Sequence, residues 1–300
     1  MHTLDHVIPL PFASHFSARA LAVAAENDAD NPRAASDELS DLESRVCEGL
    51  RSGEFHLVFQ GAYQATGDAA SSALARLEAQ VRWVHPDYGL LLPGAFMMPL
   101  EHPQVALEMA TFVVDSVCHE LRACLAAQLP VQPVAINVPA QVAVLEGFAD
   151  HVELATKTHG VPPELLHIEV ADSADAAKLL GLHSLTAGLR DLGVGISLGK
   201  WGNGASSLAA LGTLDVDTVT IAPELMAKVP RDKRAAVVMA GLIGLLQALE
   251  VRVVVGGVDS DAQRQWLSGW PDVLVQGRLF GRAQADLATI MATQREIAAG

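Results

Sequence analysis

The sequence has little aromatic content, little cysteine and little positive charge. Aromatic residues make up 5% of its 300 residues, so aliphatic side chains must fill most of the core. The three cysteines are odd in number and form no C-x-x-C pair, which predicts free thiols in a reducing cytoplasm. Lys and Arg number 20 against 35 Asp and Glu, and the net charge of −15 disfavours non-specific binding to DNA or anionic membranes.

Long uninterrupted apolar runs are also missing. The longest, Ala235–Leu246, is too short to span a bilayer. The first residues, MHTLDHVIPLPFASHF, have no basic segment followed by an unbroken apolar stretch, so we expect no signal peptide. We therefore predict a cytoplasmic protein whose partner is neither a membrane nor a nucleic acid. A small phosphorylated ligand in a local basic pocket is compatible with this charge.

Half of the residues are apolar, which allows the large core of one α/β domain with a small appendage. We assign residues 1–37 to the appendage. The polar stretch Glu26–Glu38, with Pro32, is typical of a linker, and FSARALAVAAEN before it has the composition of a short helix. The segment is either a docking arm or a loose end. The main domain is predicted over residues 38–300.

The main domain opens with a helix and a strand. Ser40 and Glu43 fit a capping box, apolar residues follow at helical spacing, and Gly53 is placed to end the helix. The next run, Phe55–Gln60, predicts a strand.

From there, short apolar runs alternate with helical patterns. The runs that predict strands are 133–138, 165–170, 194–199, 217–222, 251–256 and 272–277. The patterns that predict helices are 104–128, 140–158, 174–192, 204–211, 233–249, 259–269 and 284–298. Strands that are apolar throughout and rich in Val and Ile are typical of a parallel sheet covered on both faces. The number of units and the domain length favour an α/β fold of the (β/α)8 barrel type over an open doubly wound sheet.

Polar residues stand near the ends of three of the predicted strands. In a (β/α) barrel the chemistry lies where strands end, and Glu78, Asn137 and Glu169 occupy such positions. A buried polar group must be paired or bind a ligand, because leaving it unpaired costs about 2–7 kcal/mol. Three neighbouring oxygen-bearing side chains are either hard ligands for Mg²⁺ or Ca²⁺, or a hydrogen-bonded cluster without a metal.

Several familiar enzyme motifs are incomplete. HELRA at 119–123 lacks the second histidine of a zinc-protease helix. GVGISLG and GNGASS each lack the third glycine of a dinucleotide-binding loop. No G-x-S-x-G nucleophile elbow is present. These motifs therefore carry no functional assignment.

From Ser36 to Thr293, the order of strand ends and one long motif resemble the EAL-domain family of cyclic-diguanylate phosphodiesterases. The long motif is RWVHPDYGLLLPGAF, Arg82–Phe96. The segments that follow the family's order are FQ, EAQ, INV, HIEVADS, LGKWGNGASSL, VTI, VVGGVDS and VQG. The resemblance implies a modified (β/α)8 barrel that linearises cyclic diguanylate with two divalent ions, Mg²⁺ or Mn²⁺, and a bridging water.

The resemblance assigns family roles to residues of this chain. The name motif E-A-L-x-R-W corresponds to Glu78–Trp83, with Gln80 in place of the leucine. The remaining correspondences are Asn137 and Glu169 as metal ligands, Asp172 as the second acid of its motif, Arg82 as a phosphate contact and Gln60 along the nucleotide cleft.

Most of the family's other catalytic positions are replaced. The two aspartates of D-D-F-G-T-G correspond to Gly199 and Lys200, the lysine of K-I-D to Thr220, and the first glutamate of A-E-G-V-E to Gly256; its second glutamate corresponds to Asp259. Two-metal hydrolysis needs carboxylates that hold both ions about 3.5–4 Å apart. Lys200 adds a positive charge where the resemblance implies negative ones. We predict no metal cofactor and no meaningful phosphodiesterase activity.

Lys200 leads to one structural hypothesis. Its ammonium would lie in the vacated metal site between Glu78 and Glu169, because a buried cation offsets the cost of burying two carboxylates. The alternative is that Lys200 points to solvent.

Binding of the nucleotide without hydrolysis is a separate matter. Gln60, Arg82 and Gln276 are retained, and Lys200 would neutralise one phosphate. Arg82 is a forked donor suited to phosphate, or else part of a structural ion pair at the barrel rim. The missing side chain at Gly256 and the lost metals weigh against binding.

Three functions are compatible with these residues. The first is a catalytically inactive regulator that acts through an unidentified protein partner. The second is a receptor that binds cyclic diguanylate without cutting it, and the third is a residual metal-dependent phosphodiesterase. The resemblance also implies that the barrel can form a homodimer through its helices.

Overall fold

The computed structural model describes residues 39–66, 72–97, 102–171, 183–203, 208–212 and 215–299. The predicted arm at 1–37 and Asp172 lie outside these residues. The first described helix, α2 (Asp41–Arg51), begins with the predicted capping box. The Ser40 hydroxyl accepts from the Glu43 backbone N–H at 3.3 Å, and the Glu43 carboxylate accepts from the Ser40 backbone N–H at 2.9 Å.

Within the described residues, nine strands form a single sheet that closes on itself. They are β1 (Phe55–Gln64), β2 (Leu74–His85), β3 (Gly89–Leu91), β4 (Val134–Asn137), β5 (Leu166–Ala171), β6 (Gly195–Trp201), β7 (Thr218–Ile221), β8 (Arg252–Val255) and β9 (Leu274–Val275). Their spatial order is β1-β9-β8-β7-β6-β5-β4-β2-β3, and β1 also pairs with β2. Eight strands thus close a barrel, with β3 outside it. The closure confirms the predicted barrel and excludes an open doubly wound sheet.

Strand β1 runs antiparallel to both of its neighbours, whereas the other barrel strands are parallel to one another. The prediction that β1 ends at Gln60 is wrong, because the strand continues to Gln64. Gln60 still reaches the carboxyl-terminal ends of the parallel strands, because the register places it directly opposite Glu78.

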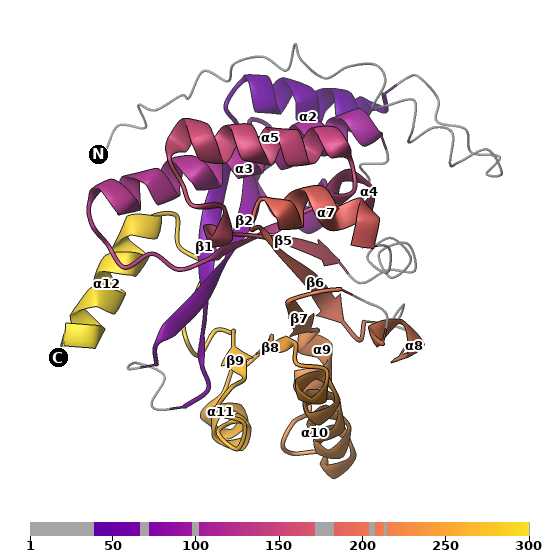
Figure 1. The fold of residues 1–300 in the computed structure, drawn as a ribbon, viewed down its shortest axis with the longest axis vertical. Helices are drawn as coiled ribbons and strands as arrows, with labels where there is room; N and C mark the ends of the chain where they lie inside the picture. Colours follow the sequence, from indigo (N-terminus) through magenta and orange to yellow (C-terminus); the bar gives the residue numbers. More distant parts are fainter. Residues whose placement is uncertain are drawn as a thin grey trace.

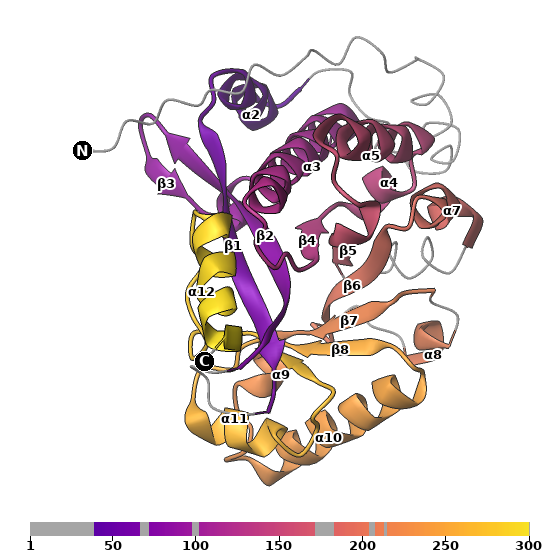
Figure 2. The same ribbon diagram turned by 60° about the vertical axis from the view of Figure 1, so that its left-hand side comes forward.

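The helices cover the outside of the barrel (Figures 1 and 2). They are α3 (Pro103–Ala126), α4 (Ala140–Ala143), α5 (Glu146–His159), α7 (His183–Asp191), α8 (Leu208–Leu211), α9 (Pro223–Met226), α10 (Lys233–Ala248), α11 (Asp261–Leu267) and α12 (Leu287–Ala299), with short 3-10 turns η1 (Pro93–Ala95) and η2 (Pro163–Leu165). In both views α3 and α5 lie side by side, and α10 and α11 lie on the opposite flank. The helix predicted over 140–158 is interrupted, because Leu145 is extended (φ −77°, ψ 127°).

An aromatic cluster closes one end of the core beneath α2. The rings of Phe55 and Trp83 stack with centroids 4.9 Å apart, and Phe96 packs edge-on against Trp83 at 5.5 Å. The Trp83 indole N–H is satisfied, because it donates to the Glu54 carboxylate at 2.8 Å. The cysteines are buried and free, as predicted, and burial raises the pKa of Cys118 to about 12.

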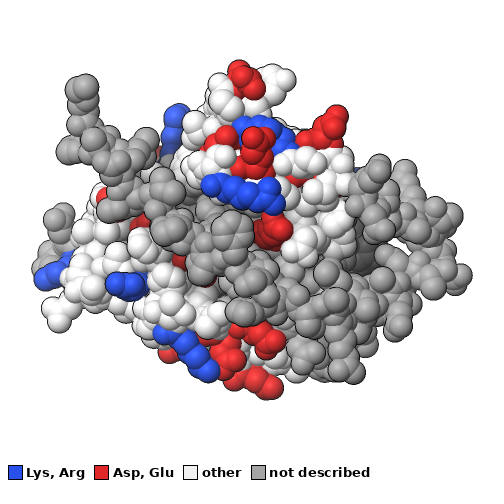
Figure 3. Space-filling view, turned by 90° about the horizontal axis from the view of Figure 1, so that it is seen from above, with Lys and Arg blue, Asp and Glu red and all other residues white. Residues whose placement is uncertain are grey.

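One face of the molecule carries charges of both signs. On the face shown in Figure 3, the described Lys and Arg side chains lie beside Asp and Glu rather than forming one basic patch. No helix within the described ranges is both long and apolar enough to cross a bilayer.

Candidate functional site

The polar residues predicted from the strand ends meet at one mouth of the barrel. Asn137 and Glu169 are register partners on β4 and β5. Glu78 on β2 lies opposite Gln60 of β1, and Gln276 directly follows β9. The closed sheet therefore gathers side chains that are far apart in sequence; Glu78 and Gln276, which are hydrogen-bonded, are 198 residues apart.

Glu78 is the acceptor at the centre of a hydrogen-bonded cluster. Its Oε1 accepts from Asn137 Nδ2 at 2.9 Å. Its Oε2 accepts from Gln276 Nε2 at 2.9 Å and from Gln80 Nε2 at 3.2 Å. Three amide donors thus satisfy both carboxylate oxygens. This arrangement matches the hydrogen-bonded alternative to a metal site.

Glu169 is held by a different kind of partner. Its Oε2 accepts from the Arg76 guanidinium, in an ion pair whose side chains are only 4% and 5% exposed for Arg76 and Glu169. The Thr220 hydroxyl donates to the same oxygen at 3.1 Å. Burial raises the pKa of Glu169, while the Arg76 charge and the Thr220 hydroxyl act in the opposite direction. The buried carboxylate therefore has its countercharge within the protein.

A small cavity lies between the two carboxylates. Its volume is ≈ 10 Å³, and its lining residues are Ala62, Arg76, Leu77, Glu78, Glu169, Thr220, Val254 and Gln276. This is roughly the room that a single water molecule needs. The Arg76 Nη1 atom is buried and has no hydrogen-bond partner in the protein. Arg76 Nη1 is therefore a buried donor without a protein partner, and Arg76 lines a cavity that also has polar lining residues.

Of Gly199 and Lys200 on β6, only Gly199 faces the site. Gly199 faces inward, and a Cβ there would lie 2.7 Å from Glu169 Oε1, so the glutamate occupies the space of a side chain. Lys200 is exposed and forms no ion pair with Glu78 or Glu169. The hypothesis that its ammonium lies between those glutamates is wrong.

The backbone explains why Lys200 turns away. Its φ of 54° is left-handed, and the register of β6 with β7 shifts between Leu198 and Trp201. Such an irregularity re-aims side chains at a strand end. The cation beside Glu169 is Arg76 instead.

Thr220 and Gly256 lie at the ends of the next two strands, β7 and β8, and differ in their relation to the cluster. Thr220 donates to Glu169, as described above, so it belongs to the cluster. Gly256 lies at the end of β8, where a Cβ would come within 3.2 Å of the Ile221 carbonyl oxygen and 3.6 Å of Pro223 Cδ. No described contact joins Gly256 to the carboxylates.

Residues assigned to the nucleotide cleft form a chain along the rim. Gln80 Nε2 donates to Gln60 Oε1 at 3.3 Å, and Gln80 Oε1 accepts from Arg82 Nη2 at 2.9 Å. Arg82 Nη1 donates to the Val81 carbonyl at 2.9 Å. Arg82 makes no ion pair with a carboxylate in the described chain, so the alternative of a structural ion pair is not realised. Burial lowers the pKa of Arg82, and Glu78 opposes this effect.

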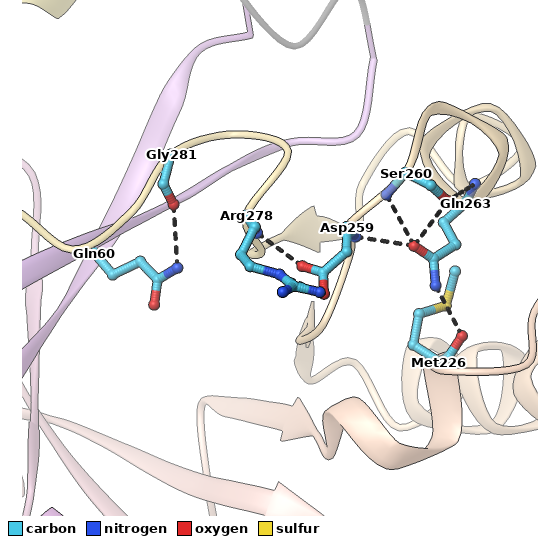
Figure 4. A network of polar contacts seen from close by, with 7 residues as sticks. All are labelled: Gln60, Met226, Asp259, Ser260, Gln263, Arg278 and Gly281. Carbon is cyan, nitrogen blue, oxygen red and sulfur yellow. Dashed lines mark hydrogen bonds and ion pairs between the residues drawn. The ribbon is translucent and has the colours of Figure 1, made fainter. Parts of the chain in front are cut away.

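Asp259 lies apart from the carboxylate cluster. Its carboxylate accepts from the Arg278 backbone N–H at 2.8 Å and from Arg278 Nη2 at 2.6 Å, and Figure 4 shows the two side chains turned toward each other. Gln60 Nε2 donates to the Gly281 carbonyl at 3.3 Å in the same region. Gln263 accepts from Ser260 and donates to the Met226 carbonyl at 3.0 Å. These contacts tie the loops after β8 and β9 together.

Arg76 is the site residue that the sequence reasoning missed. It precedes Glu78 by two positions on β2, and residues two apart on a strand share a face. An arginine two positions before a glutamate that is predicted at the barrel mouth was therefore a usable signal. Its partner could not be read from that pattern, because Glu169 lies 93 residues away.

The residues present do not fit the two divalent ions that the fold family implies. Three amides donate to the Glu78 carboxylate, and the Arg76 guanidinium and the Thr220 hydroxyl donate to Glu169 Oε2, so a cation at either of these positions would have to displace protein donors. The described residues contain no group of three or more His, Cys, Asp or Glu placed to hold a metal ion. Gly199 and the exposed Lys200, at the end of β6, add no carboxylate to the site.

Comparison with known proteins identifies one family. The model of the EAL domain matches residues 43–283. The bifunctional diguanylate cyclase/cyclic di-GMP phosphodiesterase MucR of Pseudomonas aeruginosa is 30% identical over 224 residues, which are 73% of this chain and 32% of MucR. The chain thus spans about a third of that relative. The uncharacterized protein Rv1357c of Mycobacterium tuberculosis is 29% identical over 281 residues, which are 91% of this chain and 89% of Rv1357c.

A solved structure supports the same relationship. The structure described as the PaMucR phosphodiesterase in complex with c-di-GMP matches with a TM-score of 0.72 and 27% identity. The match covers 82% of this chain and 98% of that chain.

Proposed function

Since the chain belongs to the EAL domain family, we propose that it is a non-hydrolysing regulator in cyclic-diguanylate signalling that acts through contacts with a protein partner. The observation that carries the proposal is the Arg76–Glu169 ion pair at the barrel mouth. A two-metal hydrolase needs anionic ligands that are open to cations. Here protein donors already neutralise or hydrogen-bond both remaining glutamates.

Exposed apolar side chains support the protein-contact mode. On α10, Val237 is 72% exposed, and Val238 and Leu245 are also exposed. On the β2–β3 hairpin, Tyr88 is 76% exposed and Leu90 lies near it in sequence. Clusters of exposed apolar residues mark contact surfaces more often than isolated ones do.

The first experiment is a hydrolysis assay. The purified chain is incubated with cyclic diguanylate in Mg²⁺ and in Mn²⁺, beside MucR as the positive control, and linear product is quantified by chromatography. We expect no product above the protein-free blank. Product that depends on Mn²⁺ and disappears in Glu78→Ala would instead establish a residual phosphodiesterase.

The regulatory part of the proposal needs a test in cells. A strain lacking the protein is complemented with the wild type or with Glu78→Ala, which removes the last glutamate of the name motif. We expect the wild type and Glu78→Ala to reverse the phenotype of the deletion strain equally, without changing its cyclic-diguanylate level. Loss of complementation with a rise in cyclic diguanylate would contradict a non-catalytic role.

A receptor that binds cyclic diguanylate without cutting it is the second candidate. Arg82 favours it, because each of its two terminal nitrogens makes one described hydrogen bond and no carboxylate among the described residues forms an ion pair with it. A receptor would show a rise in Tm with cyclic diguanylate in the absence of Mg²⁺, and Arg82→Ala would abolish the rise. An unchanged Tm at millimolar nucleotide would leave the protein-contact mode alone.

A further inference from the structure

We propose that Arg76 is a built-in counter-ion that takes the place of a divalent cation beside Glu169 and thereby closes the barrel mouth to metal ions. The inference rests on the proposed function, because it gives the physical reason why the site does not assemble a metal centre. It concerns a residue to which neither the family resemblance nor the relatives assign a role.

The position of Arg76 is set by the barrel. It sits in β2 on the same face as Glu78, and its guanidinium reaches the carboxylate of Glu169 on β5 in a buried ion pair. The side chains of Arg76 and Glu169 are 4% and 5% exposed, so solvent hardly screens the attraction between them. The guanidinium therefore lies where the carboxylate would otherwise coordinate a cation.

Arginine is suited to permanent exclusion. Its guanidinium stays protonated in proteins, so it does not make room for a metal by losing its proton as a lysine does. A divalent ion at Glu169 would lie a few ångströms from this fixed positive charge, in a place with little water to screen it. Breaking a buried ion pair to admit the metal would also leave the guanidinium without its partner.

The cavity beside Arg76 fits the same role. Its volume of ≈ 10 Å³ is enough for one water, and a water there can accept from Arg76 Nη1, which has no protein partner. Glu78 and Gln276 on the lining can receive the hydrogens of that water. The space suits a neutral molecule that accepts from a cation, and a metal ion cannot accept a hydrogen bond.

The test measures Mn²⁺ binding directly, by electron paramagnetic resonance and by calorimetry on the whole chain without nucleotide. We expect wild type to bind no Mn²⁺ at millimolar concentration. Arg76→Ala, and Arg76→Met which keeps most of the volume, should bind at least tenfold more tightly than wild type. Adding Glu169→Gln to either variant should remove the gain in Mn²⁺ affinity, which would show that the ion binds at Glu169.

Arg45→Ala is the matched control. Arg45 makes an ion pair with Glu54 at 2.6 Å, at a distance from the barrel mouth, and its loss should not create Mn²⁺ binding. If neither neutral variant at Arg76 gains affinity while both remain folded by circular dichroism, Arg76 is not what excludes the metal. An equal gain in Arg45→Ala would overturn the inference as well.

Crystals of the wild type soaked in Mn²⁺ keep the inference testable if the variants fail to fold. No anomalous peak is expected within about 2.5 Å of a Glu169 oxygen, and a peak there overturns it. The outcome is separable from the proposed function. If cyclic diguanylate is hydrolysed but no Mn²⁺ is bound at Glu169, only the proposed function is refuted. If Mn²⁺ is bound at Glu169 but no cyclic diguanylate is hydrolysed, only the counter-ion role of Arg76 is refuted.

Discussion

His167 should make the barrel unstable in mild acid. It lies on β5 two residues before Glu169, is 9% exposed, and its Nδ1 is 3.5 Å from the Ser197 hydroxyl. Its ring fills the space next to Gly195, where an added Cβ would lie 2.6 Å from Cε1. Burial, helped by the charges of Arg76 and Arg252 and opposed by Asp217, lowers the pKa of His167 from 6.5 to about 4.

The sign of the effect follows from proton uptake. The unfolded chain binds a proton at His167 below about pH 6.5, whereas the folded chain binds it only below about pH 4. Stability from the neutral ring is therefore complete above pH 6.5 and declines as the pH falls toward 4. At pH 5.5, one unit below the unfolded pKa, the loss is about 1.4 kcal/mol, and over the whole interval it approaches about 3 kcal/mol.

The assay compares wild type with His167→Phe, which keeps a ring over Gly195 and cannot titrate. Urea unfolding at pH 7.5 and 5.5 should show that wild type loses about 1.4 kcal/mol more than the variant on acidification. Both values of pH lie above the calculated isoelectric point of 5.0, which limits precipitation. Equal losses in the two proteins, or a His167 ring resonance that titrates near pH 6.5 in the folded state, would refute the reasoning.

Two further predictions concern backbone positions. Gly277→Ala should lower the free energy of unfolding by about 3 kcal/mol in urea titration, because the new Cβ would lie 2.5 Å from the Val258 carbonyl carbon. The control is Gly244→Ala on α10, where a new Cβ meets no atom within 4 Å. This control should raise the free energy of unfolding by about 0.4–1 kcal/mol. A Gly277→Ala protein as stable as wild type would show that the loop moves aside. Lys200→Gly should raise Tm by a few degrees by relieving a left-handed conformation of about 1 kcal/mol, and should leave Mn²⁺ binding unchanged. A lower Tm would mean that the Lys200 side chain makes a stabilising contact.

The sequence was sufficient to predict the barrel and the meeting of Glu78, Asn137, Glu169 and Gln276. Continuous apolar strands separated by helical patterns dictate a parallel sheet, and the ends of such strands share one rim. The reversed direction of β1 was not predictable from its residues, because an apolar strand reads alike in either direction. Its extension to Gln64 was missed because the polar Gln60 and the following Gly61 end the apolar run, whereas the strand continues through them.

Side-chain partners were harder to predict than strand ends. The hypothesis that Lys200 lies between Glu78 and Glu169 rested on its correspondence to a metal-binding aspartate of the family and on the need to offset two carboxylates, with an orientation to solvent as the alternative. The left-handed backbone of Lys200 turns it to solvent, and such a local irregularity has no sequence signature except at glycine or asparagine. Arg76 lies inside a strand, and its pairing depends on how β2 and β5 are brought together by the closed sheet.

At the barrel mouth, the position of Glu169 is set by Gly199, Arg76 and Thr220 together. Glu169 Oε1 lies in the space above Gly199, and the Arg76 guanidinium and the Thr220 hydroxyl hold its Oε2 there. An aspartate at 199 would therefore displace Glu169 and break a buried ion pair, at a cost of about 3–5 kcal/mol. If Arg76 is the counter-ion that we propose, adding this one acid would not create a metal centre, because Arg76 would still supply the positive charge. Gly199 and Arg76, which lie on different strands, thus both depend on the position of Glu169.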